Sequence, residues 1–188
     1  MKKQFMKVAM GLLVFGALIT SCKKDSVEEP NEEEIITTMK LTFVPVGGGT
    51  TLTYQFRDPD GAGGTAPTQD EIVLEPSKTY NVSVLILNET ESPAKDITLE
   101  VAEEADAHRF YYEPEAGSNL VVSGLNNDGN GVPLGISSTW TTNSIATGKI
   151  KVTLRHYGGM PPGKAVEDLV NSSKSNTDIE VEFNTKIQ

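Results

Sequence analysis

The two histidines of the chain, His108 and His156, are the residues best suited to bind a transition metal ion. Neutral imidazole is a good ligand for Cu²⁺, Zn²⁺ or haem iron. His156 continues the apolar face of a strand predicted at 147–157. His108 likewise ends the apolar stripe of a predicted helix. If that helix covers the strand ends, the two imidazoles meet at one rim of the domain.

A nearby carboxylate would complete such a site. Asp106 is the candidate in the segment before His108, and Glu104 is its alternative. The sequence therefore predicts a transition-metal site made by His108, His156 and Asp106. The competing interpretation is two unrelated, partly buried histidines that each bond to the backbone, since sequence spacing does not show convergence.

Two loops carry oxygen ligands at the spacing of a calcium-binding loop, which needs oxygens at alternate positions and a glycine at the sixth. The loop 126–131 has this full register, and the loop 58–63 has two of its three oxygens. Neither has a glutamate at the twelfth position to close the shell. Asx residues and glycine also favour ordinary hairpin turns, which is the alternative. The candidate Ca²⁺ ligands are Asn126, Asp128, Asn130, Asp58 and Asp60.

Motifs of the common enzyme classes are missing from the sequence. It has no G-x-S-x-G elbow, no H-E-x-x-H pair, no P-loop and no dinucleotide fingerprint. The only cysteine, Cys22, is assigned to a membrane anchor by the residues around it. We therefore expect a protein that is not an enzyme.

The first 22 residues predict export and lipidation. A basic head with three lysines precedes the apolar run 8–20, which is too short to span a bilayer and is typical of a secretory signal peptide. Ile19-Thr20-Ser21-Cys22 resembles the lipobox of bacterial lipoproteins, in which the thiol is alkylated by diacylglycerol and the peptide is cut before the cysteine. We expect residues 1–21 to be removed and Cys22 to hold the chain to the membrane. A plain signal peptide with a chance cysteine is the alternative.

An acidic segment follows the anchor. Residues 23–34, KKDSVEEPNEEE, hold six carboxylates and a single apolar residue, so 22–34 is predicted to be a lipidated cysteine with a flexible tether. The whole chain has a formal net charge of −10, which disfavours nucleic acid as a partner. The rest, 35–188, is long enough for one domain with its own core.

Nine short, mostly alternating runs separated by turn residues predict an antiparallel β-sandwich, immunoglobulin-like or Greek-key. In the first run, the odd-numbered positions are expected to face the core. The predicted strands are 35–44, 51–57, 71–75, 79–88, 110–113, 119–123, 135–142, 147–157 and 178–187.

One segment, 92–109, has the spacing of a short helix. Its apolar stripe runs from Ile97 through Val101 to His108, and Asp96 is placed to cap the start. Alternation in the same segment makes a strand that runs into a short helix the competing prediction.

The stretches EEEIITTMKLTF, RDPDGAGGTAP, ADAHRFYY, NNDGNGVPLG and KVTLRHYGG resemble a family of Bacteroidota lipoproteins over most of 32–188. The chain keeps Asp58, Asp60 and His108 of that pattern. It has Ala62 and Ala107 where the relatives carry acids. Such lipoproteins often accompany TonB-dependent receptors of the outer membrane, which implies accessory binding rather than chemistry.

The sequence thus predicts a non-enzymatic lipoprotein anchored in the outer membrane through Cys22, at the cell surface or on the periplasmic face. Its expected role is a binding or accessory module near a TonB-dependent transporter, for a metal or metal complex. The alternative is a structural or adhesion sandwich at the cell surface, with calcium-rigidified loops and no small ligand.

Overall fold

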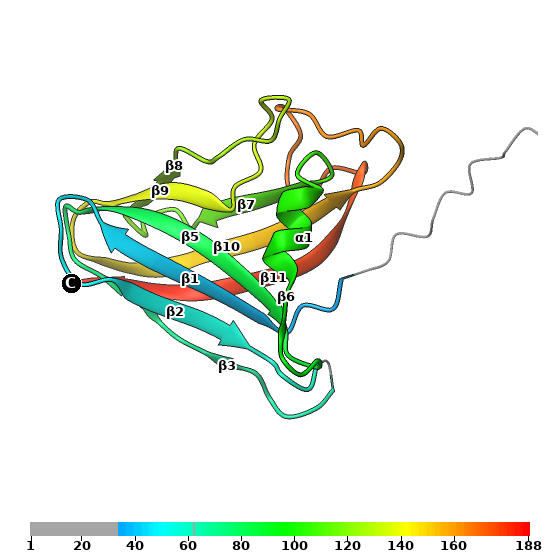
Figure 1. Cartoon of the computed structure of the whole chain (residues 1–188). Coiled ribbons are helices and arrows are strands. Elements are labelled where there is room, and N and C mark those ends of the chain that lie inside the picture. Colours follow the sequence, from blue (N-terminus) through cyan, green and yellow to red (C-terminus); the bar gives the residue numbers. More distant parts are fainter. Residues whose placement is uncertain (1–33, 62) are drawn as a thin grey trace, which may run out of the picture.

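The computed structural model describes residues 34–61 and 63–188. In this part of the chain, two β-sheets pack face to face and one short helix stands at one end of them (Figure 1). The chain enters at that end, and its last residue lies at the opposite end (Figure 1). The predicted β-sandwich is confirmed.

The larger sheet has seven strands, in the order β3-β2-β1-β5-β9-β8, with β6 paired to β5. Neighbouring strands in this sheet are antiparallel. Its strands are β1 (Thr38–Pro45), β2 (Leu52–Arg57), β3 (Thr68–Gln69), β5 (Thr79–Asn88), β6 (Lys95–Asp96), β8 (Leu120–Ser123) and β9 (Ser137–Thr142). The two-residue strands β3 and β6 were not expected from the sequence, because they are too short to show a period.

The smaller sheet has four strands, in the order β4-β11-β10-β7. Its strands are β4 (Ile72–Leu74), β11 (Ser175–Ile187), β10 (Ala146–Tyr157) and β7 (His108–Pro114). The pairs β10–β11 and β10–β7 are antiparallel, whereas β11 and β4 are parallel. The predicted antiparallel sandwich therefore has one parallel pair, at the edge where β4 adds to a strand distant in sequence.

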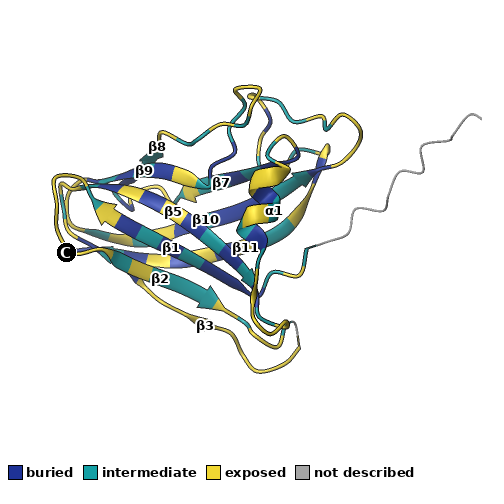
Figure 2. Ribbon diagram, viewed as in Figure 1, coloured by how far each residue is buried: buried dark blue, intermediate teal, exposed yellow. Residues whose placement is uncertain are grey.

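The core lies between the two sheets, where buried residues alternate with outward-facing ones along each strand (Figure 2). In β1 the side chains of Met39, Leu41 and Phe43 are completely buried, which confirms the predicted odd-numbered face. The Phe43 ring packs edge-on against Trp140 at 5.1 Å between centroids, an arrangement favoured by aromatic quadrupoles. Packing of this kind fixes the register that positions the strand ends.

The helix α1 (Ile97–Glu103) packs beside β5 through Ile97 and Val101. The predicted cap is confirmed, since the Asp96 carboxylate accepts a hydrogen bond from the Thr98 amide at 2.9 Å. The predicted length is wrong, because the helix ends before its cap residue Glu104. Pairing of the following residues with β10 outweighs the helical spacing.

The signal peptide 1–21, Cys22 and the tether up to residue 33 lie outside the described residues. Within the described ranges, the structure contains no helix that is both long and apolar enough to cross a membrane. Glu34, the last residue assigned to the tether, is described, and its side chain is 12% exposed. The packed domain therefore includes the residue just before the predicted boundary at 35.

Candidate metal site

The structure brings His108 and His156 together, as the sequence predicted. They are direct partners across the antiparallel pair β7–β10. Both continue the inward faces of their strands, at the end of the sandwich beside α1 (Figure 1). The ring centroids lie 4.4 Å apart and the ring planes are tilted by 36°. Strand register, rather than a helix over the strand ends, is thus what aligns the imidazoles.

His108 is completely buried and held in one tautomer. Its Nδ1 lies 3.1 Å from the carbonyl oxygen of Glu104, and because a carbonyl only accepts, Nδ1 carries the proton. The lone pair is therefore on Nε2, which is buried and has no hydrogen-bond partner. A histidine oriented by a backbone carbonyl through one nitrogen, with the other nitrogen bare, is the usual arrangement of a metal ligand.

Two carboxylates face this bare nitrogen. The Glu34 Oε1 atom lies 3.5 Å from His108 Nε2, and the Asp178 Oδ2 atom lies 4.0 Å from it. Both side chains are largely shielded from solvent, with exposed fractions of 12% for Glu34 and 0% for Asp178. The sequence reasoning missed both residues.

Asp178 reaches the interior because β11 has an irregular register. Leu154 pairs with Ile179 but the next residue of β10, Arg155, pairs with Thr177, so Asp178 is the extra residue of a β-bulge. A bulge turns one side chain out of the regular alternation and is common beside functional sites. The signal available in the sequence is an acid directly before the apolar alternation that starts at Ile179.

Glu34 comes from the segment that leads into β1. Its position at the end of an acidic run hid it among residues assigned to a solvated tether. Burial, reinforced by the negative charge of Asp178, raises the pKa of Glu34 to about 7. Glu34 is therefore poised to exchange a proton for a cation near neutral pH.

Both histidines favour the neutral form that binds metals. Burial lowers the pKa of His108 to about 4, even though its hydrogen bond to the Glu104 carbonyl acts in the opposite direction. Burial also lowers the pKa of His156, whose Nδ1 is buried and has no hydrogen-bond partner. At neutral pH two uncharged imidazoles therefore face a group of acids.

Two overlapping sets of three ligands share His108. One is Glu104, His108 and His156, and the other is Glu34, His108 and Asp178. In each set the ligand atoms all lie within 4.8 Å of one another. Asp106 belongs to neither set and is exposed, so Glu104 rather than Asp106 supplies the carboxylate beside the histidine pair. Asp106 lies in the turn between the helix cap Glu104 and the start of β7.

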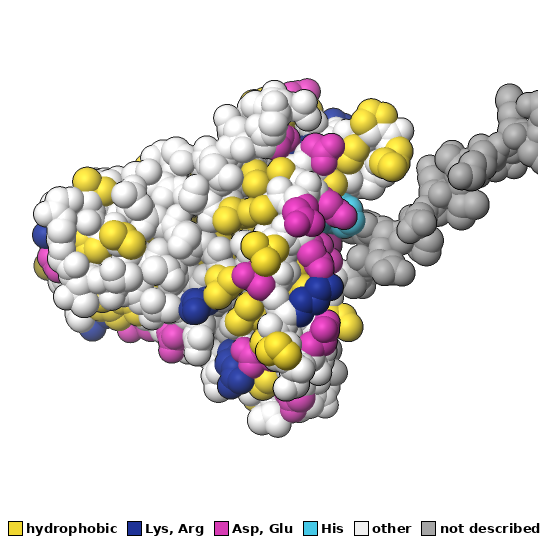
Figure 3. Space-filling model, in the orientation of Figure 1, with side chains coloured by type: hydrophobic (Ala, Val, Ile, Leu, Met, Phe, Trp, Pro, Cys, Tyr) yellow, Lys and Arg dark blue, Asp and Glu magenta, His cyan; other side chains and the backbone are white. Residues whose placement is uncertain are grey.

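Acidic side chains also mark this end of the molecule at its surface. Figure 3 shows several of them gathered around the point where a histidine is exposed. Such a grouping favours the approach of a cation.

A buried ammonium group holds the backbone beneath the site. The Lys164 Nζ atom donates to the carbonyl oxygens of Ala105 at 2.5 Å, His108 at 2.9 Å and Pro133 at 3.3 Å. It also forms an ion pair of 2.8 Å with Asp128, and the two side chains are only 1% and 2% exposed. Lys164 therefore ties its own loop, the turn after α1 and the loop 126–133 to the strand that carries His108.

This ion pair also explains the loop 126–131, which was a calcium candidate. One oxygen of Asp128 accepts from the amides of Asn130 and Val132, and the other faces Lys164. The Asn126 side-chain oxygen accepts from the Ser137 amide at 2.8 Å. Because protein donors already occupy these oxygens, the geometry is that of a tight turn, and the ammonium takes the place that Ca²⁺ would need.

The loop that begins at Asp58 also has turn chemistry. The Asp60 carboxylate accepts from the Thr65 amide at 2.8 Å, and the Asp58 carbonyl accepts from the Gly61 amide at 3.1 Å. Neither aspartate belongs to the ligand sets found among the described residues. The contacts of this second group of calcium candidates are therefore those of a turn.

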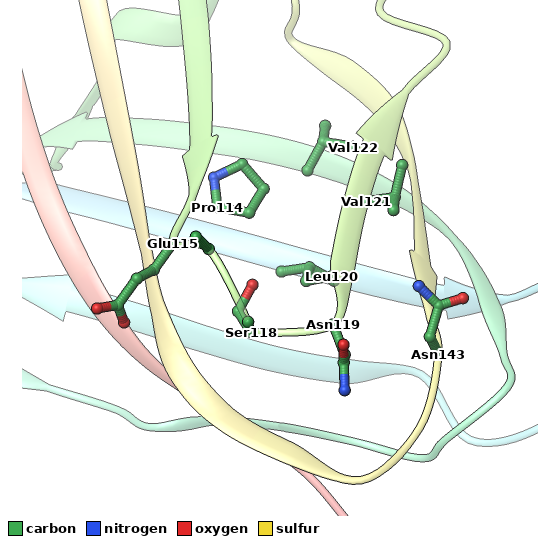
Figure 4. Close-up of a pocket in the computed structure, with 10 residues that line it drawn as sticks. Pro114, Glu115, Ser118, Asn119, Leu120, Val121, Val122 and Asn143 are labelled. Carbon is green, nitrogen blue, oxygen red and sulfur yellow. The ribbon is translucent and has the colours of Figure 1, made fainter.

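A separate surface pocket lies at the far end of β7, around Pro114 and the start of β8 (Figure 4). Glu115 is its only ionisable lining residue, and its other lining groups come mostly from the turn and from Asn143. It contains none of the predicted site residues.

The fold and the site together define a β-sandwich with a buried histidine–carboxylate cluster at one end. Comparisons with protein family models, with curated proteins and with solved structures gave no match to this chain. Its function is therefore inferred from the fold and the site alone.

Proposed function

We propose that this protein is a non-enzymatic binding module for a divalent transition metal ion, held by the cluster around His108. The observation that carries the proposal is the bare, buried Nε2 of His108 with two carboxylates within 4.0 Å of it. Acceptors facing one another in a low-dielectric site repel unless a proton or cation lies between them. A bound cation relieves that repulsion.

The ligand chemistry indicates the class of ion. A mixture of imidazole and carboxylate ligands suits Zn²⁺ or Fe²⁺ better than soft Cu(I) or hard Ca²⁺. Because His108 is completely buried, a bare ion fits better than a bulky metal complex such as haem. The adhesion alternative has less support, since its calcium loops are already satisfied by protein donors.

The proposal is tested by calorimetric titration of Zn²⁺ and Fe²⁺ into the purified full chain at pH 7.5, with Ca²⁺ as the comparison. We expect one transition-metal site per chain and much weaker binding of Ca²⁺. Equal, weak heats for all three ions would contradict a built transition-metal site.

Metal affinity should rise with pH across the neutral range. Below the Glu34 pKa of about 7, an ion must displace the proton from this carboxyl, whereas His108 with its pKa of about 4 stays neutral. Zn²⁺ affinity should therefore fall about tenfold for each pH unit below about 7, as expected for release of one proton. Titrations at several pH values between about 5.5 and 8 measure this slope.

Glu34→Gln is the matched control for the pH experiment, because it keeps the shape of the side chain and removes the titrating group. Glu34→Gln should bind Zn²⁺ more weakly, and its affinity should no longer fall as the pH drops below about 7. If the Zn²⁺ affinity of this variant still falls below about pH 7, the proton that competes with the ion belongs to a histidine instead.

We further propose that the chain is anchored as a lipoprotein through Cys22 and works beside an outer-membrane transporter. The support is the basic head, the short apolar run and the lipobox-like Ile19-Thr20-Ser21-Cys22, which lie outside the described residues. An anchored metal-binding module would raise the local concentration of an ion near a transporter.

Cys22→Ser should abolish acylation and leave the precursor uncleaved by the lipoprotein peptidase, because the thiol is the acceptor. Mass spectrometry and detergent partitioning of cells that express both forms measure the outcome. A serine variant that is still processed and acylated would contradict the anchor.

A further inference from the structure

We infer that the ion binds on the Nε2 side of His108, between Glu34 and Asp178, and that binding there fastens the entry segment of the chain to the sandwich. This inference rests on the proposed function. It selects one of the two ligand sets that share His108, and it gives metal binding a structural consequence.

Distances favour the Nε2 side. Two ligands on one tetrahedral ion, with bonds of about 2.1 Å, lie about 3.4 Å apart. The Nε2 atom of His108 is 3.5 Å from Glu34 Oε1 and 4.0 Å from Asp178 Oδ2, so small movements complete the site. On the other side, Nδ1 already donates to the Glu104 carbonyl.

Burial favours the same side. The side chains of Glu34, His108 and Asp178 are 12%, 0% and 0% exposed. Both the Nε2 atom of His108 and the Oε2 atom of Glu34 are buried and have no hydrogen-bond partner. In the other set, Glu104 is exposed and can keep its hydration without an ion. The buried polar atoms without a hydrogen-bond partner in His108 and Glu34 therefore lie on the side where we infer that the ion binds.

The chain topology gives the consequence. His108 and Asp178 belong to β7 and β11 of the smaller sheet, whereas Glu34 precedes β1 of the larger sheet. Among the described residues, Thr37 is the first whose hydrogen bonds tie this segment to the sandwich, through the Leu87 carbonyl at 2.9 Å. Glu34 lies upstream of that tie, so an ion on its carboxylate adds a new attachment point between the entry segment and the opposite sheet.

The first experiment compares Glu34→Gln with Glu104→Gln in the full chain, using Zn²⁺ in a calorimetric titration at pH 7.5. The two changes are chemically identical and remove one carboxylate from each ligand set. Loss of an outer-shell partner lowers metal affinity by about 10- to 100-fold, and Glu34→Gln, which removes a ligand, should weaken Zn²⁺ binding by more than this. Glu104→Gln should change the affinity less than about threefold, because its carboxylate does not belong to the ligand set of Glu34, His108 and Asp178.

The second experiment measures the fastening itself. A glutamate-specific protease cuts the Glu34–Ile35 bond, and mass spectrometry identifies the product that begins at Ile35, a residue that is 59% exposed. With Zn²⁺ at 100 times its Kd, cleavage of the wild type should slow by up to about 100-fold, because only the ion-free form opens. His108→Phe, which keeps a ring and loses the nitrogens, should be cut at the same rate with and without Zn²⁺.

The outcomes separate this inference from the proposed function. If Zn²⁺ binds tightly but Glu104→Gln rather than Glu34→Gln loses it, the inference is overturned and the proposed function stands. Tight binding without slower cleavage overturns the fastening. If the wild type binds no transition metal, the proposed function itself fails.

Discussion

Replacement of Asp128 by alanine is expected to lower the free energy of unfolding by about 3–5 kcal/mol, the cost of removing one partner of a buried ion pair. The Asp128 and Lys164 side chains are 2% and 1% exposed, so water does not replace the lost carboxylate. Burial lowers the pKa of Lys164, and the hydrogen bond and ion pair with Asp128 are the main effects that oppose it. Chemical denaturation followed by circular dichroism at pH 7 measures the loss.

The double variant Asp128→Leu/Lys164→Met is the control for this prediction. Replacing both charges by apolar groups removes the uncompensated ammonium, so the double variant should lose much less stability than the two single variants combined. Losses that simply add would mean that the two side chains do not interact in solution. A loss below about 1 kcal/mol for Asp128→Ala would contradict the buried ion pair.

Thermal unfolding of the wild type and of Asp128→Ala, with and without Ca²⁺, separates two interpretations of the loop 126–131. If the loop bound calcium, 1 mM Ca²⁺ would stabilise the wild type, because this concentration is on the order of the Kd of weaker extracellular calcium sites. Asp128→Ala would remove that effect. We expect no calcium-dependent shift, because Lys164 occupies the carboxylate. A clear rise of the wild-type melting temperature with Ca²⁺ would restore the calcium interpretation.

Replacement of His108 by phenylalanine is expected to remove tight transition-metal binding, the largest functional effect of any single change. The ring volume is retained, but the Nε2 lone pair that faces Glu34 and Asp178 is lost. Zn²⁺ affinity should fall by more than about 100-fold, because loss of a direct ligand lowers the affinity more than loss of an outer-shell partner, which lowers it by up to about 100-fold. Calorimetric titration at pH 7.5 measures it.

The His156→Phe variant is the matched comparison on the neighbouring strand. Its ring lies 4.4 Å from that of His108, but it belongs only to the ligand set that contains Glu104. We therefore expect a smaller loss of Zn²⁺ affinity than for His108→Phe. Equal and additive small losses in both variants would indicate two independent histidines without a shared ion.

The sequence predicts the strands and the histidine pair because both follow from local periodicity. His156 lies in register with Ile150, Val152 and Leu154, and a period of two places all four on one face. The sequence also predicts that His108 and His156 lie close together at one end of the domain. The sequence does not predict whether His108 belongs to a helix or a strand, because helical and alternating patterns overlap in that segment. Only the pairing with β10 decides between them.

Asp178 and Glu34 could not be predicted, for two different physical reasons. Asp178 faces inward through a bulge, and a bulge breaks the alternation on which assignment of faces depends. Glu34 is part of an acidic run whose composition indicates a solvated segment, yet it is shielded by long-range packing against the smaller sheet. Both residues lie within 4.0 Å of His108, which is far away from each of them in the sequence.

The Lys164–Asp128 pair shows the same limit. Lys164 lies in a loop without periodicity, and its four acceptors come from the turn after α1, from β7 and from the loop 126–133. Asp128 alone matches the calcium pattern, because a carboxylate at that position suits either a Ca²⁺ ion or an ammonium group. Only the folded chain shows which cation the loop contains.

The most direct test of the metal site is a crystal structure of the full chain grown with Zn²⁺, with diffraction data collected on both sides of the zinc absorption edge. Anomalous difference density should show one ion about 2.1 Å from His108 Nε2, with Glu34 and Asp178 as further ligands. An ion bound only at surface carboxylates, or no anomalous peak near His108 at saturating Zn²⁺, would contradict the proposed metal site.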